Sequence, residues 1–114
     1  MRIILTLSLL FLSISLVEAK APSVKIYQVD KGSQGGLAVL DFFIRAESKN
    51  GIKKLEYRAA VDGKQSGWKK YPYYDGITNH LFFKVDCDVF TLWVRSIDKM
   101  GKKSKTVSKT FSGL

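Results

Sequence analysis

Three basic residues and one tryptophan, in two segments, are the side chains of this sequence best suited to binding chemistry. Lys54 and Arg58 alternate with apolar residues in one segment, and Trp93 and Arg95 do so in another. An exposed indole beside a guanidinium forms a cation–π contact worth about 0.5–1 kcal/mol. If the two segments are neighbouring strands, they offer a platform on which an indole stacks on a sugar ring and arginine pairs with acidic groups. The same stack could instead only stiffen the sheet, since arginine stems cover an indole.

A second candidate segment holds four aromatic residues and two lysines within seven positions. Aromatic side chains in a loop give rigid, amphipathic contact area at a low cost in entropy. Such a segment suits sugar rings or a protein partner. We expect Tyr73 and Tyr74 to be its exposed pair. The segment is Trp68, Lys69, Lys70, Tyr71, Pro72, Tyr73 and Tyr74.

A third candidate surface comes from two phenylalanines that strand alternation turns outward. Phe43 and Phe82 lie in segments that would pair in one sheet, beside Val39 and Tyr27. An exposed apolar patch of this kind is typical of a protein–protein contact. The alternative is that the assumed alternation is wrong for one of the two strands.

No set of residues with catalytic or metal-binding spacing is present, and we predict a protein that is not an enzyme and needs no cofactor. His80 is the only histidine, and no nucleophile-elbow motif accompanies it. The pair Asp86 and Asp88 offers too few ligands for Ca²⁺ and flanks the only thiol, Cys87, where negative charge opposes thiolate formation. We expect a monomer, although the single thiol could link two copies.

The first nineteen residues predict export from the cytoplasm. A charged start at Arg2, an apolar run over Ile3–Val17 and the sequence Val17-Glu18-Ala19 have the form of a signal peptide with its cleavage site. The run is shorter than the ~20 apolar residues of a membrane-spanning helix. We therefore predict a signal peptide over residues 1–19, one secreted or periplasmic domain over residues 20–114, and no transmembrane segment after cleavage.

The charge balance favours acidic partners. The chain has 19 basic and 10 acidic residues, a formal net charge of +9, and removing Arg2 and Glu18 leaves it unchanged. Such an excess favours anionic partners such as acidic polysaccharide, lipid headgroups or nucleic acid. Lysines spread over a β domain can also serve only solubility and protection of sheet edges. Nucleic acid is not expected, because an exported domain seldom meets it.

The remainder of the chain reads as seven short strands, which predicts an all-β sandwich. Alternation and turn residues set their bounds, with a Gly-rich turn over residues 30–36 and a loop from Pro72 to Gly76. Poor alternation in the last strand predicts a bulge or an edge position. The expected strands cover Ser23–Val29, Leu37–Ala46, Ile52–Val61, Gly67–Tyr71, Asn79–Val85, Phe90–Ile97 and Lys103–Phe111.

Three motifs between Asn50 and Ser104 resemble bacterial immunoglobulin-like and fibronectin type III-like domains. They are NGIKKLEYR from Asn50, DG at Asp62 followed by GWKKY from Gly67, and FTLWVRSIDKMG from Phe90. The segment is also similar to the small β-sandwich that caps sensor propellers in bacterial two-component regulators. The resemblance implies a seven-stranded antiparallel immunoglobulin-like sandwich in which Trp68 packs inward and Tyr71 follows it. It also implies a spacer, adhesion or ligand-binding role.

Together these observations predict a small secreted or periplasmic binding module. It would recognise a protein or an anionic glycan through an aromatic and basic face. The alternative is a structural or assembly subunit of an exported complex, which adds an edge strand to a partner.

Overall fold

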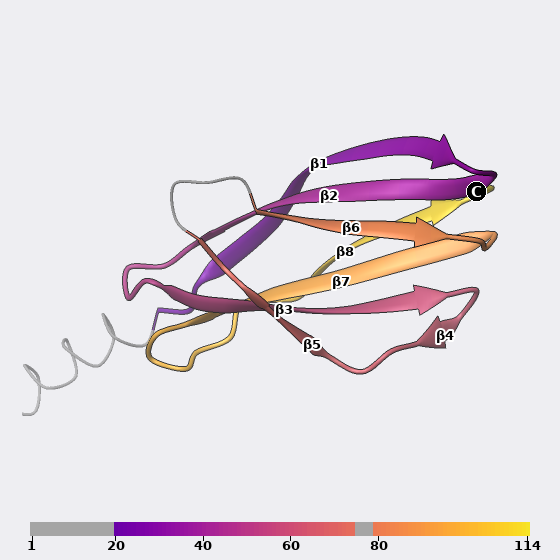
Figure 1. Cartoon of the computed structure of the whole chain (residues 1–114). Helices are drawn as coiled ribbons and strands as arrows, with labels where there is room; N and C mark the ends of the chain where they lie inside the picture. The colour runs from indigo at the N-terminus through magenta and orange to yellow at the C-terminus, as the bar shows by residue number, and fades with distance from the viewer. Residues whose placement is uncertain (1–19, 75–78) are drawn as a thin grey trace, which may run out of the picture.

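The computed structural model describes residues 20–74 and 79–114 and arranges them as eight β-strands in two antiparallel sheets (Figure 1). The predicted signal peptide lies outside the described residues. None of the described residues belongs to a helix, so none lies in one long and apolar enough to cross a membrane. The strands are β1 (Ser23–Gln34), β2 (Leu37–Glu47), β3 (Ile52–Val61), β4 (Lys64–Gln65), β5 (Lys69–Pro72), β6 (Asn79–Val85), β7 (Val89–Asp98) and β8 (Val107–Ser112).

The strand order places the two segments that carry the first candidate residues side by side. One sheet has the order β1-β2-β6, and the other has the order β4-β3-β7-β8, with β5 also paired to β3. The expected neighbours are therefore confirmed: β3 pairs with β7, and β2 pairs with β6. The last strand, β8, lies at the edge of its sheet, which fits its poor alternation.

Both sheets contribute to a single hydrophobic core. Leu40 and Phe42 of one sheet and Leu55, Phe90 and Leu92 of the other are 0–1% exposed and belong to the same cluster. The ring of Phe42 lies 6.0 Å from the ring of Phe90 across the two sheets. Full burial of a leucine or phenylalanine contributes about 1.5–3 kcal/mol. Buried and less buried residues alternate along most of β2 and β7, and this alternation sets which face of each sheet remains outside.

The first hairpin is longer and tighter than the sequence predicts. The expected turn over residues 30–36 is wrong, because β1 continues to Gln34 and pairs with β2 along its whole length. Only Gly35 and Gly36 form the turn, with φ of 59° and 82°. Two successive residues with positive φ make the hairpin turn whose twist matches that of the strands. Because residues Asp30–Gln34 are exposed and contribute little to the core, the sequence pattern did not predict that they belong to a strand.

Two further strand predictions need correction. The count of seven becomes eight, because Lys64 and Gln65 turn back on β3 as the short strand β4. Pro72 was expected to begin a loop but ends β5 opposite Lys54. An edge strand tolerates proline at its end, where the missing N–H breaks no ladder.

The last strand begins later than predicted because its first residues are held by other bonds. Lys103 makes only an isolated bridge to Ile97. Ser104 then donates its backbone N–H to the Ser96 carbonyl at 2.9 Å and accepts the Ser96 N–H on its Oγ at 2.8 Å. These bonds delay regular pairing until Val107.

The connection from β7 to β8 is built around the buried carboxylate of Asp98. Its side chain is fully buried and accepts hydrogen bonds at 2.9 Å from the backbone N–H groups of Met100 and Lys102. Asn50 Nδ2 donates a third at 3.4 Å, which ties the connection to the β2–β3 turn. Burial alone would raise the pKa of Asp98, but these bonds and the charge of Lys102 hold it below its ordinary value.

Candidate binding surface

The outer face of the larger sheet gathers the first set of candidate residues. The register places Arg58 opposite Trp93 and Glu56 opposite Arg95, and partners in an antiparallel pair point to the same side. Trp68, just before β5, completes the group by its ring contacts. We call this surface the Trp–Arg face. It consists of Lys54, Glu56, Arg58, Trp68, Trp93 and Arg95.

The rings and guanidinium groups of this face alternate in a row. The guanidinium carbon of Arg95 lies 3.9 Å from the ring centroid of Trp68. The guanidinium carbon of Arg58 lies 5.6 Å from that centroid and 5.4 Å from the centroid of Trp93. All four side chains are half-buried. Each indole therefore keeps part of its surface in solvent while a neighbouring cation fixes its position.

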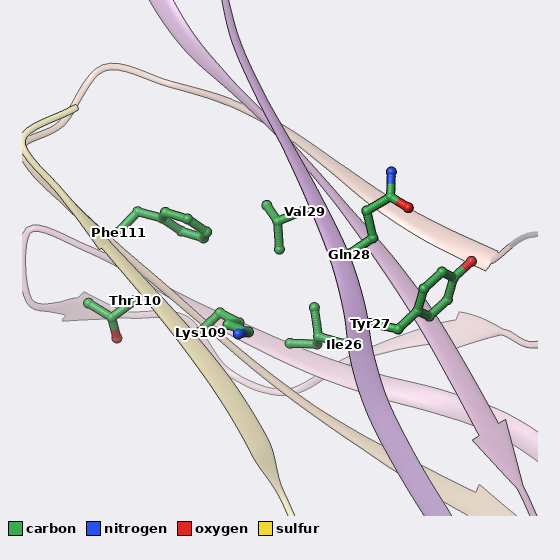
Figure 2. Close-up of a pocket in the computed structure, with 7 residues that line it drawn as sticks. All are labelled: Ile26, Tyr27, Gln28, Val29, Lys109, Thr110 and Phe111. Carbon is green, nitrogen blue, oxygen red and sulfur yellow. The ribbon is translucent and has the colours of Figure 1, made fainter.

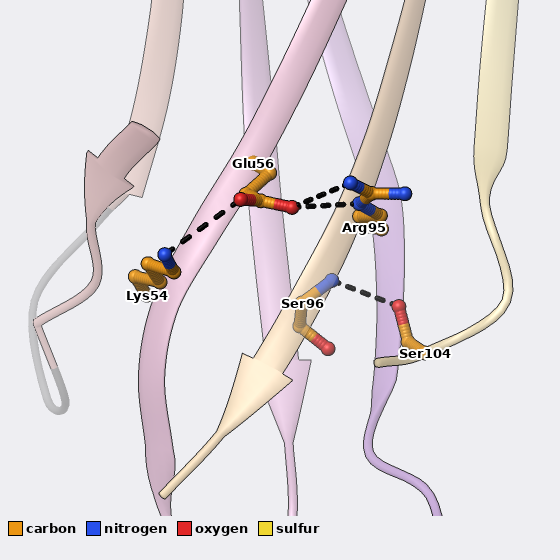
Figure 3. Close-up of polar contacts among 5 residues, drawn as sticks. All are labelled: Lys54, Glu56, Arg95, Ser96 and Ser104. Atoms are coloured by element: carbon orange, nitrogen blue, oxygen red, sulfur yellow. Dashed lines mark hydrogen bonds and ion pairs between the residues drawn. The ribbon is translucent and has the colours of Figure 1, made fainter. Parts of the chain in front are cut away.

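One carboxylate, that of Glu56, contacts two basic side chains of this face, Arg95 and Lys54 (Figure 3). Glu56 Oε1 accepts a hydrogen bond from Arg95 Nε at 2.8 Å and lies 2.7 Å from Arg95 Nη2 in an ion pair, and Lys54 Nζ lies 3.7 Å from Glu56 Oε2. Burial of Glu56 opposes its ionisation. The hydrogen bonds and charge of Arg95, with the charges of Lys54 and Lys103, outweigh that effect and lower the pKa of Glu56.

Arg58 is held differently from Arg95. Its Nη2 donates to Gln65 Oε1 on β4, whereas its Nε is buried and has no hydrogen-bond partner among the described residues. The contacts with both indoles take the place of a carboxylate partner. Arg58 therefore differs from Arg95 in that no described acidic side chain lies within ion-pair distance of it.

The two lysines of the second candidate segment separate onto opposite faces of the sheet. The strand register places Lys70 opposite Glu56, so Lys70 lies on the Trp–Arg face and adds a cation to it. The strand register places Lys69 opposite Tyr57, and Lys69 lines a hollow beside Phe83 and Phe90 on the core side of the sheet. Strand alternation forces this separation, because successive residues point to opposite sides.

The aromatic residues of the second segment also divide, and two expectations about them are wrong. Trp68 was expected to pack inward but lies on the outer face. Tyr73 was expected to be exposed but is half-buried against the core, with its hydroxyl donating to the Ala46 carbonyl at 3.1 Å. Tyr71 packs against the core as expected, and Tyr74 is 55% exposed. The inward position expected for Trp68 rests on the resemblance alone. The local pattern, with two lysines between Trp68 and Tyr71, does not indicate which face of the sheet Trp68 lies on.

The outer face of the smaller sheet carries a second aromatic row. The ring of Phe43 lies 5.6 Å from that of His80 and 6.2 Å from that of Tyr27, and His80 Nδ1 lies 2.7 Å from Asp41 Oδ1. Phe82 is 54% exposed on the same face. The outward direction predicted for Phe43 and Phe82 is confirmed. We call this surface the Tyr–Phe–His face; it consists of Tyr27, Asp41, Phe43, Arg45, His80 and Phe82.

A hollow of about 370 Å³ opens between the edge strands of the two sheets. In Figure 2 the side chains of Ile26 and Val29 from β1 extend toward Phe111 from β8. Lys109 and Thr110 line the same opening. An opening with an edge strand on each side is the kind of place where a further strand can pair.

The only thiol, that of Cys87, lies between β6 and β7, close to several carboxylates. Burial and the charges of Asp62, Asp88 and Asp86 raise the pKa of Cys87, which opposes thiolate formation as the sequence predicts. Within residues 20–74 and 79–114, no group of three histidine, cysteine or acidic side chains is placed to hold a metal ion.

Comparison with known proteins does not assign the chain to a family. No protein-family model matches the sequence, and a search of the curated proteins finds no match. The Trp–Arg face must therefore be interpreted from its own chemistry.

Proposed function

We propose that this protein is an exported, non-enzymatic binding module that recognises an acidic glycan through the Trp–Arg face. Its fold would be an immunoglobulin-like β-sandwich related to fibronectin type III-like domains, with β4 added to the seven expected strands. Two antiparallel sheets that share one core support that fold. The leader sequence supports export.

The row of alternating arginines and tryptophans is the observation that carries this proposal. A glycan-binding platform needs aromatic faces for sugar rings and fixed cations for acidic groups. Here Trp68 and Trp93 supply the faces, and Arg58 supplies a charge with no described acidic side chain within ion-pair distance. Because these side chains are already held by one another, binding would cost little ordering entropy.

Intrinsic fluorescence gives a direct test, because the chain has two tryptophans and both lie on this face. Titration with polygalacturonate and with dextran sulfate should change the emission, and the change should weaken as salt rises. The neutral polymer dextran is the reference. We expect the substitution Arg58→Gln to weaken binding about tenfold, since a hydrogen bond to a charged group contributes about 1.5–3 kcal/mol.

Lys84→Gln is the matched control, because it removes one positive charge from the other sheet. It should leave the affinity within about twofold, as expected for an exposed charge distant from the site. If Arg58→Gln and Lys84→Gln weaken binding equally, the interaction follows net charge alone and the proposed face is not the site. Absence of any emission change with both polyanions would also reject it.

A role as an assembly subunit is the second candidate, favoured by the opening between β1 and β8. An extended segment of a partner could pair with either edge and cover Ile26, Val29 and Phe111. The substitution Val29→Lys would place a charge in that opening. Loss of a partner in pull-down with this variant, but not with Arg58→Gln, would support assembly over glycan binding.

A further inference from the structure

The outer face of the smaller sheet arranges its charged side chains in bands. This sheet consists of β1, β2 and β6, and the register across the three strands defines rows of side chains that point away from the core (Figure 1). One row holds Lys25 opposite Arg45, and another holds Asp30 opposite Asp41. The aromatic row of the Tyr–Phe–His face lies between them, with Phe43 at its centre. The face therefore has a basic band, an aromatic band and an acidic band.

A bulge in β1 places two of these charges on the same face. Lys25 and Asp30 are five positions apart, so in a regular strand they would point to opposite sides of the sheet. The register shifts at Tyr27, which is the extra residue. Ile26 and Val29 therefore both pack against the core, and Lys25 and Asp30 both point outward. One extra residue in β1 thus extends both charged bands across two strands.

The two charged bands are unfavourable within a single copy of the chain. Like charges directly opposite each other in a sheet repel. Lys25, Asp30 and Arg45 are exposed, and none of them forms an ion pair with another described residue. Asp41 has one ionic contact among the described residues, with His80. A partner that brings acidic groups to the basic band and basic groups to the acidic band would remove both repulsions.

This arrangement of bands is complementary to a second copy of itself. A two-fold axis that lies between two facing sheets, at right angles to their strands, reverses the strand direction in one of them. Arg45 and Asp41 each lie two residues from Phe43, a distance of about 7 Å along the strand. An axis at Phe43 therefore brings Arg45 of each copy over Asp41 of the other. The register of β1 then brings Lys25 of each copy over Asp30 of the other.

The balance of charge also distinguishes this face from the rest of the molecule. The register turns three basic and three acidic described side chains toward it, although the whole chain has a formal net charge of +9. The Trp–Arg face, by contrast, has Glu56 as its one acidic residue. Two copies can therefore approach through the smaller sheet without the repulsion that opposes contact elsewhere. The six charged residues are Lys25, Arg45, Lys84, Asp30, Asp41 and Glu47.

The aromatic band supplies apolar area, and the size of the sheet limits the strength of the contact. Tyr27 is 43% exposed and Phe82 is 54% exposed. Three strands about 4.8 Å apart, with a rise of about 3.4 Å per residue, give a face of roughly 500 Å² on each copy. A total of about 1,000 Å² is at the low end for a specific interface. The contact is therefore expected to be weak.

We infer that two copies of this chain form a weak, two-fold symmetric dimer through the Tyr–Phe–His face, extended by Lys25 and Asp30 of β1. The monomer that the sequence predicts is the form at low concentration. In the dimer the two Trp–Arg faces point away from each other, so both remain accessible. This inference does not depend on the proposed glycan function, because the two use opposite faces of the molecule.

Sedimentation equilibrium tests for the dimer directly. At concentrations from about 10 µM to about 1 mM we expect a dissociation constant of about 100 µM, as suits an interface of this size. Unfolding experiments at far lower concentrations then report on the monomer. A protein that remains monomeric throughout this range would overturn the inference.

Two variants with exchanged charges locate the contact. Lys25→Glu with Arg45→Glu makes both bands acidic, and Asp30→Lys with Asp41→Lys makes both bands basic. Each variant alone should associate with itself at least about tenfold more weakly than the wild type, because like charges now face each other across the axis. An equimolar mixture of the two should form a heterodimer at least as tight as the wild-type dimer. Wild-type association of each variant alone would overturn the inference.

The control for net charge is Lys64→Glu with Lys109→Glu, which exchanges two exposed lysines of the other sheet. Its net charge equals that of the variant with two acidic bands. The control should associate with itself within about threefold of the wild type, as expected for charges outside the contact. Mixed with the basic-band variant, it should not form the tight heterodimer. If both mixtures associate equally, the attraction follows net charge alone and the proposed face is not the contact.

Cross-linking of the wild-type protein gives a result that does not depend on any variant. Carbodiimide joins an amine to a carboxylate as an amide, and isotopically light and heavy protein mixed in equal amounts reveal which links join two copies. Within one copy Lys25 and Asp30 lie four ladder positions apart, about 14 Å. At a concentration where the dimer forms, a linked Lys25–Asp30 peptide with one light and one heavy half is expected. Its absence from that sample would contradict the proposed two-fold arrangement.

Discussion

The two outer faces of this molecule both carry aromatic rings among charged side chains, but they hold them in different ways. On the Trp–Arg face, the half-buried Glu56 binds both Arg95 and Lys54, and each arginine packs on an indole. On the Tyr–Phe–His face, the single Asp41–His80 pair is more open, with 47% of the histidine side chain exposed. Phe82 is 54% exposed there.

This difference separates side chains that stabilise the fold from side chains that merely occupy a surface. A buried or half-buried ring with several partners contributes packing as well as cation–π energy. An exposed ring contributes little to stability and remains available to another molecule. The two faces can be compared by making the same kind of substitution on each.

The largest effect is expected from Trp68→Ala. This substitution removes the ring that contacts both Arg58 and Arg95, at 5.6 and 3.9 Å from its centroid. Two cation–π contacts and the burial of half an indole predict a loss of about 2–3 kcal/mol in the free energy of unfolding. Urea unfolding measures it. If the free energy of unfolding falls no more than it does when an exposed residue is substituted, the row of arginines and tryptophans does not stabilise the fold.

Glu56→Gln is expected to cost about 1–2 kcal/mol at neutral pH, because Arg95 and Lys54 lose an ionised partner. The folded state lowers the pKa of Glu56 below its ordinary value of 4.5. The stabilisation is therefore complete above pH 4.5 and disappears as the pH falls through the folded-state pKa. Urea unfolding of both proteins from pH 7 downward should show the two stabilities converging in acid. A constant difference would contradict this role.

Asp41→Asn is the matching change on the Tyr–Phe–His face, and its cost should be smaller, about 0.5–1 kcal/mol. The substitution removes a carboxylate whose Oδ1 lies 2.7 Å from His80 Nδ1, but solvent reaches both side chains. Thermal unfolding compares it with Glu56→Gln under identical conditions. If the two carboxylate substitutions cost the same, the faces do not differ in the way proposed here.

Phe82→Ala should have the smallest effect, within about 0.5 kcal/mol, as for most exposed positions. The same unfolding assay that detects Trp68→Ala should barely register it. A large loss would mean that Phe82 packs against something in the folded protein, for instance a second copy. Analytical ultracentrifugation at several concentrations would distinguish that case.

Strand positions and the direction of most side chains could be predicted from the sequence wherever alternation is strong. The bounds of β3 and β6 were predicted correctly, and those of β2 and β7 to within one residue at each end. Phe43 and Phe82 were predicted to face outward, and their strand neighbours Phe42 and Leu81 are buried. Alternation succeeds there because one face of each strand must be apolar to form the core.

Predictions failed where local pattern is weak or where a distant contact decides. The polar end of β1 has few core residues, and only its pairing with β2 defines it as a strand. Tyr73 is turned inward by a hydrogen bond to Ala46, which is 27 positions away. Trp68 lies outside because Arg58 and Arg95 meet there across two strands, a contact that no local pattern encodes.

The sequence alone determined that the chain forms β-strands and which residues of β2, β3 and β7 are apolar enough to be buried, because burial follows a period of two along each strand. It also supplied the lysines, the two tryptophans and the apolar run over Ile3–Val17. Only the tertiary structure decided that Arg95, Trp68, Arg58 and Trp93 form one row. Strand register brings these four side chains together, and the register depends on residues far apart in the chain.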